Sequence, residues 1–194
     1  ITYELDEITV GNGAKQLIYN AFMATLNPGD EVIIPSPYWV SYPDMVALCD
    51  GKPIIIDCPK EQNYLLEPAQ LERAISYKTK WIILNSPSNP TGMIYSTEQL
   101  SALLKVVAKF PNISILSDDI YEHVIYDNCT VKTSAEVMPH LKNRILTING
   151  VSKCYAMTGW RIGYAAGSKE LIKAMNVIQS QSTSNAWSIS QIAS

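Results

Sequence analysis

The sequence has little charge and no motif that would bind a metal. Charged residues make up 17% of its 194 residues, below the roughly 25% of an ordinary soluble domain. Its 15 basic and 18 acidic residues give a net charge of −3, so no basic surface for nucleic acid is expected. The two histidines and four cysteines follow no metal-ligand spacing, which argues against a metal site and against a disulfide framework.

Long apolar runs are also absent. No run approaches the 18 apolar residues of a membrane span, and no charged-then-apolar leader opens the chain. Together with the scattered cysteines, this predicts a cytoplasmic protein without a membrane partner. The chain begins at Ile1 without a Met and stops abruptly at Ser194, so we expect it to be a fragment. Its low charge suggests that part of its natural surface is covered by a partner.

Strand-like and helix-like segments alternate along the whole chain, a pattern that predicts an α/β domain with a mostly parallel sheet. Ser96 and Gln99 form a capping box that opens one of the helices. The predicted helices cover residues 14–26, 68–76, about 96–110 and 169–179. The predicted strands cover residues 8–10, 31–35, 53–57, 81–85, 113–116, 144–149 and 160–166.

Polar clusters follow four of these strands, at residues 11–15, 85–92, 118–121 and 149–153. In open α/β sheets, ligands bind outside the carboxyl ends of the strands. Four unusual strand ends are more than a core requires. They predict a binding site at that edge of the sheet.

The first cluster, Gly11-Asn12-Gly13-Ala14-Lys15, is a Gly-rich turn that enters a helix. Its free backbone amides and the positive end of the helix dipole would bind a phosphate group. Taken alone, a plain tight turn explains these residues at least as well. A dinucleotide fingerprint is excluded because position 16 is Gln instead of Gly.

The second cluster, residues 85–92, contains Pro87 and Pro90, which restrict the residues before them. Such a stiff loop would hold the Asn89 side chain in one orientation as a hydrogen-bond donor. Alternatively, the loop only connects two elements of the structure, and the sequence does not favour one interpretation over the other.

In the third cluster, Asp118 ends an apolar strand and Tyr121 follows three residues later. A buried carboxylate at a strand end usually caps a helix or pairs with a base. The functional alternative is that Asp118 faces a cationic ring nitrogen while Tyr121 donates to an adjacent oxygen.

The fourth cluster leads into residues 152–164, the most informative stretch. Lys153 follows a strand in an apolar neighbourhood, where desolvation would lower its pKa and free its amine. Most lysines, however, only solubilise a surface. Arg161 lies between Trp160 and Ile162 in a predicted apolar strand, where its guanidinium would need an anion such as phosphate.

Five stretches of the chain resemble, in order and spacing, the large domain of fold-type I pyridoxal-phosphate enzymes. The resemblance is to class I/II aminotransferases, most of all to the prokaryotic-type aspartate aminotransferases. The motif S-K-x-x-x-M-T-G-W-R-I-G-Y at residues 152–164 is highly specific. The other stretches are residues 11–16, 36–43, 85–92 and 117–123. The resemblance implies a three-layer α/β/α fold, with residues 1–194 as the cofactor-binding domain.

The resemblance implies pyridoxal 5'-phosphate as the cofactor and assigns roles to its contacts. Lys153 would hold the cofactor as a Schiff base and move the proton at the substrate Cα. Asp118 would keep the pyridine nitrogen protonated, so that the ring accepts electrons. Tyr121 and Asn89 would hydrogen-bond the ring oxygen, and Trp39 would stack on the ring. Lys153, Asp118 and Tyr121 are thus the predicted catalytic residues.

The phosphate of the cofactor would be bound, by the same resemblance, by Gly13, Ala14, Lys15, Ser152 and Arg161. One departure is Gly150, which stands where some relatives have a phosphate-binding serine. The arginine that binds the substrate carboxylate in this family would lie in a C-terminal small domain beyond Ser194. An N-terminal segment and a tyrosine from the partner subunit would be missing too. We therefore expect the fragment alone to be inactive and the full-length enzyme to be a homodimer.

The substrate contacts implied by the resemblance are Lys15, Trp39 and Asn89. A lysine at the position of Lys15 is linked to an acidic substrate side chain, which favours L-aspartate and 2-oxoglutarate. An aromatic, alanine or prephenate aminotransferase remains an alternative. So does a pyridoxal-phosphate-binding regulatory module without catalysis.

Overall fold

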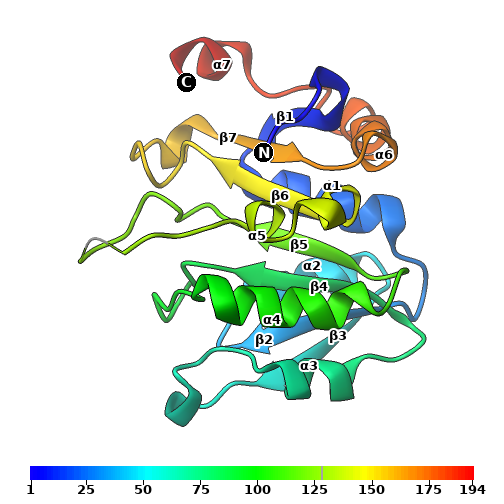
Figure 1. Ribbon diagram of the computed structural model, residues 1–194. Coiled ribbons are helices and arrows are strands. Elements are labelled where there is room, and N and C mark those ends of the chain that lie inside the picture. Colours follow the sequence, from blue (N-terminus) through cyan, green and yellow to red (C-terminus); the bar gives the residue numbers. More distant parts are fainter. Residues whose placement is uncertain (128) are drawn as a thin grey trace.

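One sheet of seven strands organises the computed structural model, which describes residues 1–127 and 129–194 (Figure 1). The strands are β1 (Ile8–Asn12), β2 (Glu31–Ser36), β3 (Lys52–Asp57), β4 (Thr79–Asn85), β5 (Ser114–Asp118), β6 (Ile145–Gly150) and β7 (Ile162–Ala166). Their order across the sheet is β1-β7-β6-β5-β4-β2-β3. Strands β2 to β6 pair in parallel, and β7 runs antiparallel to both β1 and β6. The predicted mostly parallel sheet is confirmed.

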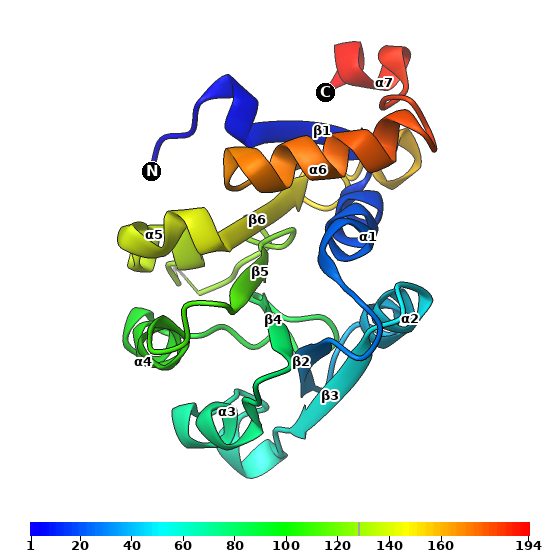
Figure 2. The same cartoon turned by 90° about the vertical axis from the view of Figure 1, so that its right-hand side faces the viewer.

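Helices cover both faces of this sheet, which confirms the predicted three layers (Figure 2). One face carries α1 (Ala14–Thr25), α2 (Ser41–Leu48) and α6 (Lys169–Ser180). The other carries α3 (Pro68–Ala74), α4 (Thr97–Ala108) and the short α5 (Ser134–Val137). Helix α7 (Ser188–Ala193) lies near the C-terminus. Of the helices in residues 1–127 and 129–194, none has the length and apolar character needed to cross a membrane.

The apolar side chains explain why the strands lie where they do. Residues 32–34 of β2 and 82–84 of β4 are apolar without interruption and at most 2% exposed, as expected for strands covered on both faces. Alternate residues therefore enter two separate cores, with Ile33 facing α3 and α4 and Ile34 facing α1 and α2. The central strands are fixed between two helical layers, and their carboxyl ends are held in register.

The capping box predicted for α4 is present. The Ser96 hydroxyl accepts from the Gln99 backbone N–H at 3.2 Å, and the Gln99 side chain accepts from the Ser96 N–H at 2.9 Å. The helix begins at Thr97 and buries Leu100, Leu103 and Leu104 on its inner face. Here the local sequence signal and the packing agree.

The structure differs from the sequence prediction at several elements, since helices α2, α5 and α7 were not predicted and one strand begins later than expected. Helix α2 was not predicted, because it has only eight residues and Pro43 lies in its first turn, where proline is tolerated. The last predicted strand, residues 160–166, begins two residues later, at Ile162. Residues Thr158–Trp160 form a 3₁₀ turn instead, and Arg161 then takes a left-handed conformation with φ 55°.

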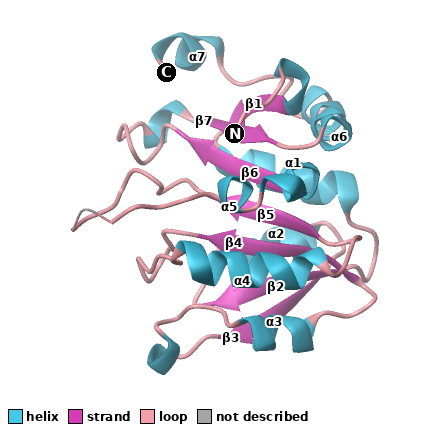
Figure 3. Cartoon of the chain, in the orientation of Figure 1, coloured by secondary structure: helices cyan, strands magenta, loops and turns pink. Residues whose placement is uncertain are grey.

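Figure 3 shows why the polar clusters converge, since loops leave the carboxyl ends of β4, β5 and β6 on the same side of the sheet. The register pairs Asn85 with Asp118, and Asp118 with Ile148. Adjacent parallel strands therefore place the second, third and fourth clusters beside one another. The first cluster joins them through β7, which connects β6 to β1.

Candidate active site

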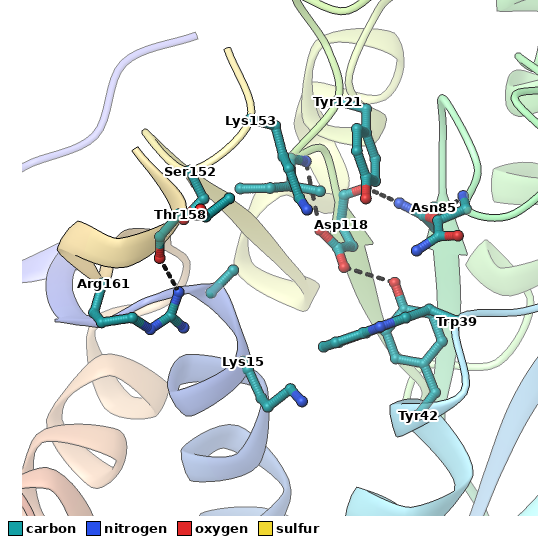
Figure 4. Close-up of a pocket in the computed structure, with 13 residues that line it drawn as sticks. Lys15, Trp39, Tyr42, Asn85, Asp118, Tyr121, Ser152, Lys153, Thr158 and Arg161 are labelled. Carbon is teal, nitrogen blue, oxygen red and sulfur yellow. Dashed lines mark hydrogen bonds between the residues drawn. The ribbon is translucent and has the colours of Figure 1, made fainter. Parts of the chain in front are cut away.

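A cavity of about 280 Å³ opens at this edge of the sheet (Figure 4). Nine of the ten residues predicted for the site line it, and the tenth, Gly13, directly precedes the lining residue Ala14. The sequence-distant clusters thus form one site. The thirteen lining residues are Ala14, Lys15, Trp39, Tyr42, Asn85, Asn89, Asp118, Ile120, Tyr121, Ser152, Lys153, Thr158 and Arg161.

One end of the cavity is built to bind an anion. Gly13 is the N-cap of α1 and has no side chain to cap it, so the first amides of the helix are available to a ligand. The Arg161 guanidinium lies over Gly13, where an added Cβ would be only 2.2 Å from Nη2. Ser152 contributes a hydroxyl group. A helix N-terminus, a guanidinium and a hydroxyl together suit a phosphate group.

The environment of Arg161 differs from the predicted one. Its side chain is exposed, and it comes from the turn before β7 instead of from an apolar strand. Its Nη1 donates to the carbonyl oxygen of Thr158 at 2.8 Å, and its Nη2 donates to that of Asn12 at 3.4 Å. These backbone contacts orient the guanidinium beside the α1 N-terminus. Its position, and not burial, is what fits it to an anion.

The opposite side of the cavity holds a buried acid. Asp118 ends β5 and is 3% exposed. The Tyr42 hydroxyl donates to its Oδ2 at 2.6 Å, and the Ile120 backbone N–H donates to its Oδ1 at 3.4 Å. Burial raises the pKa of Asp118 from an ordinary 3.8 to about 6, although both hydrogen bonds lower it. At neutral pH the cavity therefore contains a desolvated carboxylate that would bind a cation strongly.

The loop after β4 is anchored to the same acid-bearing strand. The Asn85 side chain donates through Nδ2 to the Asp118 carbonyl oxygen at 2.8 Å. Its Oδ1 accepts from the Asn89 backbone N–H, also at 2.8 Å. Asn85 thus fixes the backbone at Asn89, whose side chain lines the cavity. The hydrogen bonds of Asn85 thus anchor the loop backbone at Asn89, whereas the predicted role of the Asn89 side chain stays a prediction.

Lys153 lies between the two ends of the cavity in Figure 4 and comes from the turn after β6. Its Nζ is 5.6 Å from the centre of the Tyr121 ring. The apolar, desolvated neighbourhood expected for Lys153 is wrong for this chain, because the residue is exposed. Its amine is accessible to a ligand in the cavity.

Lys15 and Trp39 line a further part of the cavity. The Lys15 Nζ lies 4.8 Å from the centre of the Trp39 ring, within the range of a cation–π contact. Trp39 packs edge-to-face on Tyr42, with ring centres 5.3 Å apart and an interplanar angle of 90°. The indole therefore packs against Tyr42, the same side chain that donates to Asp118.

Glycines let the strands approach closely beneath the anion-binding end. A Cβ added to Gly150 would lie 2.7 Å from the Ile162 carbonyl oxygen and 3.0 Å from the Gly163 Cα. A Cβ on Gly163 would lie 2.4 Å from the Ala14 nitrogen. A serine at position 150 would therefore push β7 away from β6. This close approach of β6 and β7 explains why position 150 is a glycine.

A family model described as "Aminotransferase class I and II" matches residues 1–194, the whole chain. The chain belongs to this family. It is 63% identical over 193 residues to the "Probable aspartate/prephenate aminotransferase" of Rickettsia typhi, covering 100% of this chain and 48% of that relative. It is 57% identical over 194 residues to the aspartate aminotransferase of Rhizobium meliloti strain 1021, covering 47% of that relative.

Solved structures of aspartate aminotransferases share the fold. The Rhizobium meliloti crystal structure superimposes with a TM-score of 0.98 at 57% identity, covering 100% of this chain and 48% of that one. The Thermus thermophilus enzyme with maleate gives a TM-score of 0.92 at 44% identity, covering 97% and 48%. The chain spans about half the length of the curated relatives it matches.

Four lining residues of this aminotransferase domain were not predicted from the sequence: Tyr42, Asn85, Ile120 and Thr158. Tyr42 and Asn85 support the site through hydrogen bonds to Asp118, while Thr158 holds Arg161 through its carbonyl oxygen. All four lie within or next to the motif stretches. Their neighbourhood was visible in the sequence, whereas their hydrogen-bond partners were not.

Proposed function

We propose that the full-length protein carrying this domain is a pyridoxal-phosphate-dependent aminotransferase that uses L-aspartate and 2-oxoglutarate. Residues 1–194 would be its large, cofactor-binding domain. The observation that carries the proposal is the cavity itself, which places an accessible lysine between an anion-binding helix end and a buried carboxylate. Relatives named aspartate aminotransferase and aspartate/prephenate aminotransferase support it.

The residues present fit pyridoxal phosphate at both ends. The α1 N-terminus, Ser152 and Arg161 would hold the phosphate group, and the missing side chain of Gly13 lets the Arg161 guanidinium lie close to the α1 N-terminus. Asp118 would face the pyridine nitrogen, and Trp39 would stack on the ring. When bound, the cofactor supplies an electron-accepting ring that stabilises negative charge at the substrate Cα.

The side chains of this domain would then divide the work between orientation and proton transfer. Asp118 is ionised above a pKa of about 6 and would hold a proton on the ring nitrogen. Tyr121 and Asn89 would donate to the ring oxygen and fix the tilt of the ring. The Nζ of Lys153 would attach the cofactor. Once the substrate has displaced it, the free amine would move the proton of the substrate Cα.

The preference for an acidic substrate rests on Lys15. Its ammonium lies at the cavity beside Trp39 and would pair with a second carboxylate of the substrate. Aspartate carries such a group, and so does prephenate, which appears in the name of the Rickettsia typhi relative. Prephenate is therefore the second candidate. The arginine for the α-carboxylate and the expected homodimer stay predictions that concern the rest of the protein.

Replacing Lys153 by Ala in the full-length protein tests the reaction. We expect the wild type to bind pyridoxal phosphate with a yellow colour that borohydride removes, and to form oxaloacetate from aspartate and 2-oxoglutarate. The Lys153→Ala variant should lose the covalent attachment and at least ~100-fold in kcat. The exposed Lys173 on α6 gives a matched control, Lys173→Ala, that should behave as the wild type.

Two results would contradict this assignment. Covalent attachment that persists in Lys153→Ala would show that another group holds the cofactor. A wild-type protein that binds the cofactor but transfers no amino group from any amino acid would instead be a non-catalytic binding module.

A further inference from the structure

Two neighbouring turns carry Tyr121 and Lys153, two of the three residues assigned to catalysis, and the backbone pairing of the sheet does not extend to these turns. Tyr121 lies in the turn after β5, and Lys153 lies in the turn after β6. The ladder between these strands ends where Asp118 pairs with Ile148, and one more backbone hydrogen bond joins Asp119 N–H to the Ile148 carbonyl at 2.9 Å. Beyond that point the relative position of the turns depends on side chains.

The Asn149 side chain makes the connection. It is 5% exposed, and its Nδ2 donates to Glu122 Oε1 in the other turn at 2.6 Å. Its Oδ1 accepts from the Gly150 backbone N–H at 2.7 Å, at the point where β6 ends. One end of the amide thus holds its own strand terminus, and the other end reaches across to the neighbouring turn.

Glu122 is itself fixed within its turn. Its backbone N–H donates to the Asp119 carbonyl oxygen at 2.9 Å, directly after Tyr121 in sequence. The His123 Nε2 lies 3.3 Å from the same Oε1 that accepts from Asn149. A short hydrogen bond to a carboxylate is among the stronger ones in proteins. The contact therefore links two otherwise independent chain segments firmly.

We propose that the Asn149–Glu122 hydrogen bond positions Tyr121 and Lys153 for the reaction of the bound cofactor. Both partners are positioning residues, since neither lines the cavity. The inference rests on the proposed function, because it assigns the two turns a common ligand. Small displacements are costly in such a site, where a shift of about 1 Å can lower a rate by roughly 100-fold.

The test exchanges the donor and the acceptor. Asn149→Asp keeps the oxygen that accepts from Gly150 N–H, removes the donor to Glu122 and sets two carboxylates against each other. Glu122→Gln alone keeps an acceptor oxygen for Asn149. The double variant Asn149→Asp/Glu122→Gln restores the hydrogen bond in the opposite direction. A matched control is Thr9→Val, which removes another 2.6 Å side-chain hydrogen bond, from Thr9 to Asn176, away from the cavity.

Three measurements on the full-length protein separate positioning from simple stability. They are kcat and KM with aspartate, the pH midpoint of the absorption of pyridoxal phosphate bound at Lys153, and hydrogen exchange of residues 150–157 in the cofactor-free protein. For Asn149→Asp we expect a ~10-fold or larger fall in kcat, a smaller change in KM, a midpoint shifted by about one unit, and faster exchange. The double variant should recover most of each change.

The control and the double variant decide the interpretation. If Asn149→Asp, like the control Thr9→Val, keeps the wild-type kcat and midpoint, the positioning role is overturned. It is also overturned if the double variant recovers none of the losses. If the wild type shows no Lys153-linked absorption, the proposed function fails, whereas the exchange measurement still reports whether the hydrogen bond holds the two turns together.

Discussion

Replacing Asp118 by Asn should stabilise the cofactor-free protein at neutral and alkaline pH while it removes a residue assigned to catalysis. The carboxylate is 3% exposed, and burial keeps its pKa near 6 despite hydrogen bonds from Tyr42 and Ile120. An asparagine fills nearly the same volume. Its amide oxygen can accept from the Ile120 N–H, and its Nδ2 can donate to the Tyr42 hydroxyl oxygen once that hydroxyl group rotates. The substitution therefore removes the buried charge and keeps the contacts.

The size of the effect follows from the pKa of Asp118. A rise from 3.8 to about 6 corresponds to about 3 kcal/mol at roughly 1.4 kcal/mol per unit. Between these two pH values the folded state binds more protons than the unfolded state, so this carboxyl lowers the stability of the wild type as pH rises. The loss begins at about pH 3, where the unfolded carboxyl starts to ionise, and it is complete above about pH 7. The amide that replaces the carboxyl in Asp118→Asn does not titrate, so the variant should avoid that loss.

The assay is urea unfolding of the full-length, cofactor-free wild type and Asp118→Asn between pH 4 and pH 8.5. We expect the stability difference to move in favour of the variant by about 2.5 kcal/mol across this range, because part of the full ~3 kcal/mol is already lost at pH 4. The adjacent Asp119 is also buried with a raised pKa, mainly through desolvation and in part through the charge of Asp118, so removing that charge should lower the pKa of Asp119 and add to the effect in the same direction. A difference that stays constant with pH would refute the reasoning, because Asp118 would then titrate alike in both states.

Two further substitutions test the anion-binding end of the cavity and the contact between Lys15 and Trp39. Gly13→Ala places a Cβ 2.2 Å from Arg161 Nη2 at a residue with φ 84°, so the affinity for pyridoxal phosphate should fall at least ~10-fold. The control is Gly159→Ala, whose Cβ meets no atom within 4 Å and which should leave the dissociation constant unchanged. Equal affinities would show that Gly13 is not part of the phosphate site. Lys15→Ala should lower kcat/KM for aspartate ~10-fold more than for an aromatic amino acid, and an equal fall for both would rule out the role given to Lys15.

The fold was largely predictable because its strands are apolar over short runs and its helices carry a regular apolar face. Buried residues 32–34 and 82–84 can only be central strands once helices flank them. Helix α2 escaped prediction because eight residues give too few turns for a clear period. The conformation of Arg161 escaped it for another reason. A left-handed φ at a non-glycine residue is imposed by the surrounding structure and has no signal in the residue type.

The site was predictable to the extent that topology brings strand ends together. Polar residues that follow apolar strands must meet at the carboxyl edge of a parallel sheet, which is why all four predicted clusters contribute residues to one cavity. Trp39 was predicted only through the family resemblance. The supporting contacts were not predictable. Tyr42 and Asp118 are 76 positions apart, and only the three-dimensional packing shows that one donates to the other.

The placement of β7 determines when the binding site can first exist during synthesis. This strand is the last of the seven in sequence, yet it lies between β1 and β6 and sets Arg161 beside the N-terminus of α1. A growing chain that has not yet released residues 162–166 leaves the facing edges of β1 and β6 unpaired and has no phosphate end to its cavity. Binding of the proposed cofactor would thus occur only in chains in which β7 has paired with both β1 and β6. Pyridoxal phosphate would stabilise only the form in which β7 is paired, and it would not protect earlier intermediates with unpaired strand edges from aggregation.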